Sequence, residues 1–390
     1  MINIIKKEDC VGCNGCLQIC PKRCIAMQED EQGFLYPEVD AEQCINCGLC
    51  EKVCPVINQY EPTEPLYAYA AKNVDTNIQN TSSSGGVFYA LTEKVINGGG
   101  LVVGARFNEN WEVVHDYSET LEGVRKFQRS KYVQSKIGDP YIKAREFLNQ
   151  DRKVLFSGTP CQIAGLKRFL RKDYVERLIA VDIACHGVPS PKIWLEYLDE
   201  ITSSMSLSKD SISQINFRDK RYGWDKYGMS ITFEKKSKSE EYFSPMHQNI
   251  YRQGFLKNLY LRPSCYACPA KCGKSQSDLT LADFWGINNF YIELYNEGYY
   301  SLVLSKTEGG DRELKDLTQF CKSEVSYEKA IKGNPALVSS STYPHYYKDF
   351  WQKYISKGIS GLKEIIKRMR PSFFERLKSK IMKIIKRYLS

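Results

Sequence analysis

The chain has 390 residues, a formal net charge of +9 and fifteen cysteines. This length allows two or three domains with a sizeable core. The start lacks the basic and apolar regions of a secretory signal, and no stretch approaches ~18 consecutive apolar residues, so we expect no transmembrane helix. We therefore expect a cytoplasmic protein, in which metal ligation explains dense, regularly spaced cysteines better than disulfides do.

The positive charge is concentrated at one end of the chain. Residues 357–390 hold eleven Lys or Arg against two Glu, so the first 356 residues are about neutral and give no reason to expect nucleic-acid binding. Within 362–390, apolar residues such as Ile381, Ile384 and Ile385 form one helical stripe opposite lysines and arginines. This pattern predicts a basic amphipathic tail over 357–390. Such a tail can lie on an anionic membrane surface, at the inner face of the membrane, or dock on the protein's own body.

Residues 1–60 contain an internal repeat. A C-x2-C-x2-C-x3-C-P run occurs twice, about 34 residues apart. One such loop delivers three thiolates to an iron–sulfur cube, and in two-cluster ferredoxins the fourth cysteine ligates the other cluster. We therefore predict a ferredoxin-like domain with two [4Fe–4S] clusters. Cluster one is bound by Cys10, Cys13, Cys16 and Cys54, and cluster two by Cys44, Cys47, Cys50 and Cys20. Structural zinc is the alternative, although zinc sites usually pair two C-x2-C halves across a spacer. Cys24 falls outside the pattern, as a buried or spare thiol.

A second domain is predicted at residues 66–345, after a linker that contains Pro62 and Pro65. It opens with a strand at 66–71, a helix at 87–96 and two strands joined by a turn at 108–110. Helices predicted at 141–149, 162–170 and 191–201 then alternate with strands at 153–156 and 178–184, which indicates parallel βα units. Strands within 212–245, a helix near 246–258, a strand at 301–305 and a helix near 310–320 follow. The predicted fold class is α/β or α+β, with the ferredoxin-like domain in front.

A third cysteine group stands at Cys265, Cys268 and Cys272, in the spacing C-x2-C-x3-C. Three close cysteines require a fourth ligand from elsewhere. Cys161, at the start of a predicted helix, and Cys185, at the end of the neighbouring strand, are the candidates, because sites form where parallel strands end and a helix N-terminus favours a thiolate. We prefer Cys161 and predict a third [4Fe–4S] cluster. A zinc site and a redox-active thiol at Cys161 are the alternatives.

Five segments of the body carry a family resemblance. They are Ser82 to Gly86, Ser130 to Ser135, Phe156 to Gln162, Cys185 to Ser190 and Leu279 to Gly286. In these the chain resembles the beta subunits of coenzyme F420 (deazaflavin) hydrogenases and dehydrogenases, in versions with a fused ferredoxin domain. Such versions occur in bacteria, including beside polysaccharide-synthesis genes. The resemblance implies an iron–sulfur flavoprotein that passes electrons between clusters, FAD and a hydride-carrying substrate.

The flavin site is expected in the segments that carry the resemblance. Ser82 to Gly86 precede a helix, whose free amides can cradle a phosphate. No G-x-G-x-x-G follows a strand, so another arrangement must hold the flavin. Lys131 and Tyr132 offer a cation and a hydroxyl to a pyrophosphate or a flavin ring. The expected cofactor-binding residues are Ser82, Ser84, Gly85, Gly86, Lys131, Tyr132, Gln134, Ser135, Gly158 and Thr159. An N-cap and a solvated loop are the ordinary alternatives for these segments.

The expected catalytic residues are His186 and Cys185. His186 can donate a proton near N5 of a flavin, although a lone histidine after a strand also serves as a structural hydrogen-bonding residue. Asp283 is either an orienting residue of the site or a turn aspartate. The expected function is an oxidoreductase in which a flavin exchanges hydride with a deazaflavin-type or other small carrier, or electrons pass to a redox partner protein. The alternatives are a relay or adaptor subunit without substrate chemistry, and a protein with structural metal sites.

Overall fold

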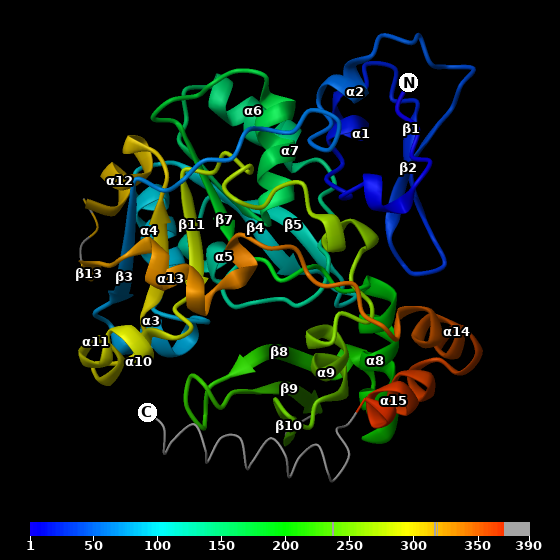
Figure 1. The fold of residues 1–390 in the computed structure, drawn as a ribbon, viewed down its shortest axis with the longest axis vertical. Coiled ribbons are helices and arrows are strands. Elements are labelled where there is room, and N and C mark those ends of the chain that lie inside the picture. Colours follow the sequence, from blue (N-terminus) through cyan, green and yellow to red (C-terminus); the bar gives the residue numbers. More distant parts are fainter. Residues whose placement is uncertain (236–237, 316, 318, 370–390) are drawn as a thin grey trace.

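The computed structural model describes residues 1–235, 238–315, 317 and 319–369. Figure 1 shows an eight-stranded sheet in the middle, the N-terminal domain at one end and a three-stranded sheet at the other. The predicted fold class is confirmed, since a small cysteine-rich domain precedes a mixed α/β body with parallel strands. In the described part of the chain, no helix is long and apolar enough to cross a membrane.

The N-terminal domain is a hairpin flanked by two short helices, each of which begins inside a cysteine run. α1 (Gly15–Ile19) and α2 (Leu49–Lys52) follow Asn14 and Gly48, both of which have left-handed backbone conformations. The hairpin, β1 (Ile25–Glu29) and β2 (Leu35–Val39), was not predicted. Its turn docks closely on the body, because a Cβ at Gly33 would lie 2.4 Å from the Cβ of Lys192. A single 3-10 turn at Lys7–Asp9 precedes these elements.

The central sheet has the strand order β13-β3-β12-β11-β7-β6-β4-β5. β4, β6, β7 and β11 run parallel to one another, as the predicted βα units require, and the other strands are antiparallel to their neighbours. The strands are β3 (Tyr67–Asn73), β4 (Leu101–Phe107), β5 (Val113–Ser118), β6 (Val154–Gly158), β7 (Leu178–Ile183), β11 (Leu279–Asp283), β12 (Ser301–Ser305) and β13 (Phe320–Glu324). β11 and β13 were not predicted as strands.

Helices cover both faces of this sheet. Alternation along each strand sends Val103 and Phe156 to one core with α6 (Pro140–Asn149) and α7 (Pro160–Leu170). Val102 and Leu155 point to the opposite core, with α4 (Val87–Asn97), α5 (Leu121–Arg125) and α12 (Glu308–Lys315). Shorter helices lie around the sheet: α3 (Thr76–Thr81), α10 (Ile287–Phe290), α11 (Ile292–Asn296), α13 (Tyr327–Gly333) and the 3-10 turns Lys209–Ser211, Pro263–Ala267 and Pro335–Leu337.

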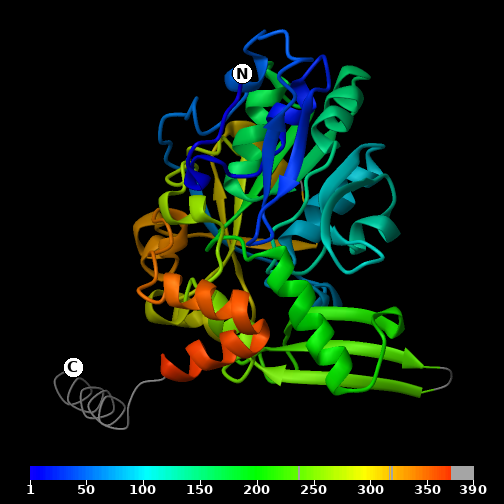
Figure 2. The same cartoon turned by 90° about the vertical axis from the view of Figure 1, so that its right-hand side faces the viewer.

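The second sheet has a core of its own, in which four helices take part. Its antiparallel strands are β8 (Ile212–Asp219), β9 (Gly228–Lys235) and β10 (Lys238–Pro245). The helices are α8 (Pro191–Ser204), α9 (Ile250–Leu256), α14 (Tyr347–Lys357) and α15 (Ile359–Arg368). Figure 2 shows α14 and α15, in orange and red, beside α8.

α15 lies in the segment that the sequence assigns to the basic tail. Its residues Leu362, Ile365 and Ile366 are fully buried in the core of the second sheet. The first part of the predicted tail is therefore a core helix of the body, which is the docked alternative. Residues 370–390, with the apolar stripe at Ile381 to Leu389, lie outside the described residues.

Candidate functional site

The eight cysteines of the repeat form two groups, and each group takes its fourth member from the other run. Cys20 lines one small cavity together with Cys44, Cys47 and Cys50. In the other group, burial and then the thiols of Cys10 and Cys54 raise the pKa of Cys16 to about 12. This grouping is the one expected of a two-cluster ferredoxin. Cys24 lies beside the second group, with its sulfur 3.4 Å from that of Cys20.

The group of Cys10, Cys13, Cys16 and Cys54, the ligands expected for cluster one, lies against the body. Cys13 is buried and packs on α7 at Gly165, where a Cβ would lie 2.9 Å from the Cβ of Cys13 and 3.0 Å from its sulfur. Only a glycine allows this approach without displacing the thiol. Cys161 lies one helical turn earlier on the same helix, so α7 connects cluster one to the third cysteine group.

The third cysteine group differs from the sequence prediction in one member. Cys161, Cys185, Cys265 and Cys268 line a single small cavity. Burial, and then the thiols of Cys268 and Cys185, raise the pKa of Cys161 to about 12. Cys272, the predicted ligand, lies outside this cavity with an exposed side chain, and its thiol donates to the carbonyl oxygen of Val338. Cys185 therefore occupies the place that the sequence analysis gave to Cys272.

The surroundings of this group supply donors to it. The amide of Val188 donates to the sulfur of Cys265 at 3.4 Å, and Lys271 donates to the carbonyl oxygen of Cys185 at 2.5 Å. In the described part of the chain, no three His, Cys, Asp or Glu side chains are arranged to hold a single metal ion.

A cavity of about 530 Å³ lies beside the third cysteine group. The two spaces share the segment 185–188, which follows the end of β7. Most of the predicted flavin and catalytic residues line the large cavity: Ser82, Ser84, Gly86, Lys131, Tyr132, Ser135, Gly158, Thr159, Cys185 and His186. Residues from four separate segments thus converge on one space.

Gly85 and Gln134, which the sequence analysis also assigned to the flavin, are placed elsewhere. Gly85 packs on β3, where a Cβ would lie 2.5 Å from the carbonyl oxygen of Ala71, and its amide donates to Ser301. Gln134 points toward the N-terminal domain and donates to the carbonyl oxygen of Val11 at 3.2 Å. Both residues are held by contacts outside the cavity, and neither lines it.

The N-terminus of α4 faces the cavity. Gly86, at the N-cap, has φ +83° and offers no side chain to cap the first turn. The amides of this turn therefore remain available, together with the helix dipole, for an anion. Ser83 bonds to Ser130 at 2.9 Å, which ties this loop to the second predicted segment.

Lys131 does not belong to a solvated loop. Its ammonium group donates to the carbonyl oxygens of Lys126 and Gln128, at the end of α5, at 3.0 and 2.7 Å. Burial, and then the charge of Arg129, lower the pKa of Lys131 to about 7. The charge of Lys131 at the cavity wall is thus sensitive to pH near neutrality.

His186 lies on the wall between the two spaces. Its Nε2 is 2.6 Å from Oδ1 of Asn258, whose own Nδ2 donates to the carbonyl oxygen of Thr342. This network assigns the ring proton to Nε2. Burial lowers the pKa of His186, so the neutral ring presents Nδ1 as an acceptor. A neutral imidazole can accept a proton at Nδ1, and the role of His186 as a proton donor near a flavin stays a prediction.

Three residues of the cavity wall escaped the sequence analysis. His115 is buried, its Nε2 lies 3.1 Å from the carbonyl oxygen of Ser157, and burial lowers its pKa to about 4. Arg252 bonds to the hydroxyl of Tyr227, and both line the cavity. These residues stand singly in unrelated segments, so no spacing in the sequence marks them. Asp283, left open above, ends β11 and forms an ion pair with the buried Arg218.

Two family models match the chain. Residues 151–329 match the model for the C terminus of the beta subunit of coenzyme F420 hydrogenase/dehydrogenase, and residues 9–58 match that of a 4Fe–4S dicluster domain. A solved structure, described as the xenon derivatization of the F420-reducing [NiFe] hydrogenase complex from Methanosarcina barkeri, contains a similar chain. The two are 14% identical with a TM-score of 0.45, over 79% of this chain and 93% of that one. No curated protein matches.

The matched segments include the cysteine repeat, α7, β7 and the loop of the third cysteine group. Residues 151–329 therefore correspond to the C-terminal part of the coenzyme F420 hydrogenase/dehydrogenase beta subunit, and residues 9–58 to a 4Fe–4S dicluster domain. Together these two matches support the expected resemblance, with an N-terminal ferredoxin domain, and an electron-transferring oxidoreductase.

Proposed function

We propose that the chain is an iron–sulfur flavoprotein that passes electrons between its N-terminal clusters and FAD, by way of a third [4Fe–4S] cluster. One observation carries the proposal. The cavity of the third cysteine group and the cavity of about 530 Å³ share the segment from Cys185 to Val188. A cluster and a flavin held in these two spaces would border the same short segment, which would suit electron transfer.

The ligands of the third cluster are, in this proposal, Cys161, Cys185, Cys265 and Cys268. The thiols come from α7, the end of β7 and the loop after α9, so they reach one space from several directions. Soft thiolate donors suit iron–sulfur clusters, and the amide of Val188 offers the N–H···S contact typical of such sites. Cys185 is then a ligand and has no separate catalytic role.

The flavin fits the large cavity on three counts. Its volume of about 530 Å³ lies in the range of ligand sites. The uncapped first turn of α4 and the cation of Lys131 suit the phosphates. Apolar and aromatic side chains, such as Phe255 and Trp285, suit a flat ring. When bound, a flavin exchanges single electrons with clusters and hydride with a small carrier.

The order of the sites defines a route. Cys47 of cluster two is exposed, and a redox partner protein can approach it. Cluster one is covered by α7 through the contact of Cys13 with Gly165, and Cys161 follows one turn away on the same helix. The segment at Cys185 and His186 then borders the flavin cavity. His186 accepts or returns a proton through Nδ1 at this border.

The test is the cofactor inventory of the full chain, purified without oxygen. The proposal predicts about twelve irons and a matching amount of acid-labile sulfide per chain. It also predicts one released flavin, which a hydride donor such as a reduced deazaflavin or NADH bleaches in the bound state. Lys131→Met should lower flavin content without lowering iron.

Three outcomes overturn parts of the proposal. About twelve irons without flavin assigns the chain to the relay or adaptor class. Zinc without sulfide removes the clusters altogether. A chain with flavin and only about eight irons lacks the third cluster, so the route from cluster one to the flavin fails.

A further inference from the structure

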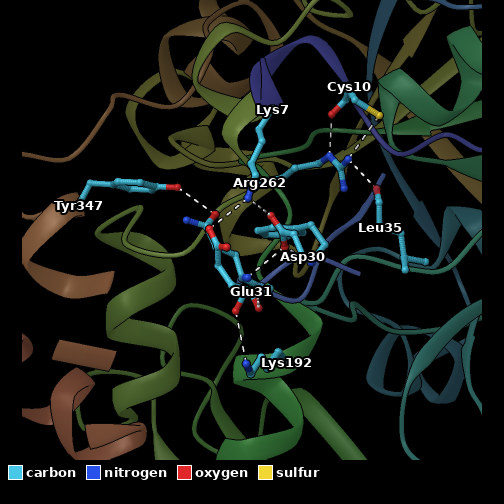
Figure 3. Close-up of polar contacts among 11 residues, drawn as sticks. Lys7, Cys10, Asp30, Glu31, Leu35, Lys192, Arg262 and Tyr347 are labelled. Atoms are coloured by element: carbon cyan, nitrogen blue, oxygen red, sulfur yellow. Dashed lines mark hydrogen bonds and ion pairs between the residues drawn. The ribbon is translucent and has the colours of Figure 1, made fainter. Parts of the chain in front are cut away.

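Arg262 reaches from the loop of the third cysteine group into the N-terminal domain (Figure 3). Its side chain is 1% exposed. The guanidinium donates from Nε to the carbonyl oxygen of Cys10 at 2.7 Å, and from Nη2 to that of Leu35 at 2.9 Å. Nη2 also lies 3.4 Å from the sulfur of Cys10, and Nη1 donates to Oε1 of Gln134 at 3.1 Å. One buried cation thus holds a ligand residue of cluster one by its backbone and by its sulfur.

No carboxylate among the described residues forms an ion pair with Arg262. Its partners are neutral carbonyl oxygens, the Cys10 sulfur and the faces of Phe34 and Tyr36, with ring centroids 5.5 and 4.3 Å from the guanidinium carbon. A buried charge requires a compensating charge nearby. A cluster held by four thiolates is an anion, and cluster one is the anion within reach of this cation.

The fold keeps space for this cation. Gly12, between Cys10 and Cys13, has φ +69°, and a Cβ there would lie 2.8 Å from Nη1 of Arg262 and 2.9 Å from Nε2 of Gln134. A side chain at this position would push the guanidinium away. Gly12 therefore allows the contact with Arg262 as well as the turn of the first cysteine run.

Arg262 also belongs to the third site. Its carbonyl oxygen accepts from the amide of Cys265 at 2.8 Å, and Arg262 is among the residues that line the cavity of the four thiols. The same residue thus touches a ligand of cluster one and neighbours a ligand of the third site. In the described chain, no Lys or Arg side chain donates to a thiol of cluster two.

We propose that Arg262 is a positioning residue that raises the reduction potential of cluster one and fixes this cluster next to the third site. The proposal rests on the function proposed above. Reduction adds negative charge to the cluster, so a buried cation and an N–H···S bond stabilise the reduced form more than the oxidised form. A higher potential at cluster one than at cluster two would favour the electron at cluster one, the cluster that Arg262 links to the third site.

The experiment is an anaerobic redox titration of the full chain, followed by electron paramagnetic resonance. Cluster two is the internal reference, identified as the signal that Cys47→Ser alters. In Arg262→Gln we expect the ratio of reduced to oxidised cluster one, at a fixed potential, to fall at least tenfold. That fall equals about 59 mV for a one-electron couple. The ratio for cluster two should stay unchanged.

Two matched variants separate charge from docking. Gln134→Met removes the hydrogen bonds to Nη1 and to Val11 but keeps the cation, and should leave the ratio unchanged. Arg262→Lys keeps a charge but cannot reach all its acceptors at once, and should lower the ratio at least threefold. This variant also serves if Arg262→Gln fails to retain cluster one.

The proposal is overturned if an arginine variant with full cluster content leaves the ratio unchanged. It is also overturned if Gln134→Met lowers the ratio as much as Arg262→Gln does, since docking would then explain the effect. Iron, sulfide and flavin are measured on the same samples. A wild-type chain without flavin or a third cluster contradicts the proposed function, whereas the titration of cluster one still tests Arg262.

Discussion

Replacing Cys185 and Cys272 in turn distinguishes the ligand set seen in the structure from the one expected from the sequence. Cys185 lines the cavity of the third cysteine group with Cys161, Cys265 and Cys268. Cys272 is exposed and bonds to the carbonyl oxygen of Val338. We expect Cys185→Ala to lose the third cluster and Cys272→Ala to keep it.

The magnitude follows from the stoichiometry of the site. Each [4Fe–4S] cluster holds four irons, so Cys185→Ala should fall from about twelve to about eight irons per chain, with an equal loss of sulfide. Cys272→Ala should stay near twelve, as should Cys321→Ala, a control on the edge strand β13. Removing a ligand from a cluster buried in the body should also abolish reduction of the flavin through cluster two, because the route is interrupted.

The assay is iron and sulfide analysis of the anaerobically purified variants. The electron paramagnetic resonance signals of the reduced state are also integrated, to give the number of spins per chain. The eight N-terminal cysteines are untouched, so their two signals report that each variant is folded. If Cys272→Ala loses about four irons while Cys185→Ala retains them, the loop 265–274 rearranges around a cluster and our ligand set is wrong.

The remaining predictions concern packing, pH and the basic segment. Gly165→Ala should overpack the contact with cluster one, because its Cβ would lie 2.9 Å from the Cβ of Cys13. We expect it to destabilise the fold by about 1–3 kcal/mol and to lower the thermal midpoint. The control Gly309→Ala, whose Cβ would have its nearest neighbour at 3.7 Å, should leave the midpoint unchanged. Burial lowers the pKa of His115 from 6.5 to about 4. As the pH falls, the unfolded chain therefore binds this proton at a higher pH than the folded chain does. The free energy of unfolding should therefore fall by up to about 3 kcal/mol as the pH drops from 6.5 to about 4. If the thermal midpoint of His115→Gln depends on pH in the same way as that of the wild type, this prediction is wrong. Leu362→Ala should lower the free energy of unfolding in urea by about 2–5 kcal/mol, since α15 is a core helix. If the basic tail lies on a membrane surface, removing residues 370–390, with seven Lys or Arg against one Glu, should abolish co-sedimentation with anionic vesicles; equal sedimentation of both chains would remove this alternative.

The parts of the site that could be predicted from the sequence are those whose geometry is local. The two cysteine runs each supply three ligands from one loop, so their spacing alone identifies the N-terminal clusters. The alternation of helices and strands likewise predicted the parallel units of the sheet. The position of Gly86 before a helix could also be predicted, and it lies at the N-cap of α4 on the cavity wall, whereas its role toward a flavin stays a prediction.

The rest depends on contacts between distant segments. Cys272 stands in good spacing with Cys268, yet the left-handed backbone at Cys272 and the packing of Gly273 on Thr63 carry it away from the group. Cys185 replaces it only because β7 ends beside that loop. Gln134 lies in a segment expected to bind the flavin, whereas its side chain contacts the N-terminal domain. Helical periodicity at Leu362 is the same for a membrane-facing helix and a docked one, so the sequence left both open.

The arrangement of the sites also bears on which partners can use them. A protein partner can approach cluster two, since Cys47 and Ile45 are exposed at its rim. In the proposed function a small carrier instead enters the cavity that His186 lines, which borders the third cysteine group. Arg262 and Gly165 hold Cys10 and Cys13 against the body, so the proposed route does not require the N-terminal domain to move. If the proposed function holds, the protein partner and the small carrier use separate sites, and both can be bound at the same time. A steady-state assay with both partners should then follow two-site ping-pong kinetics, because the cofactors store electrons between the two half-reactions.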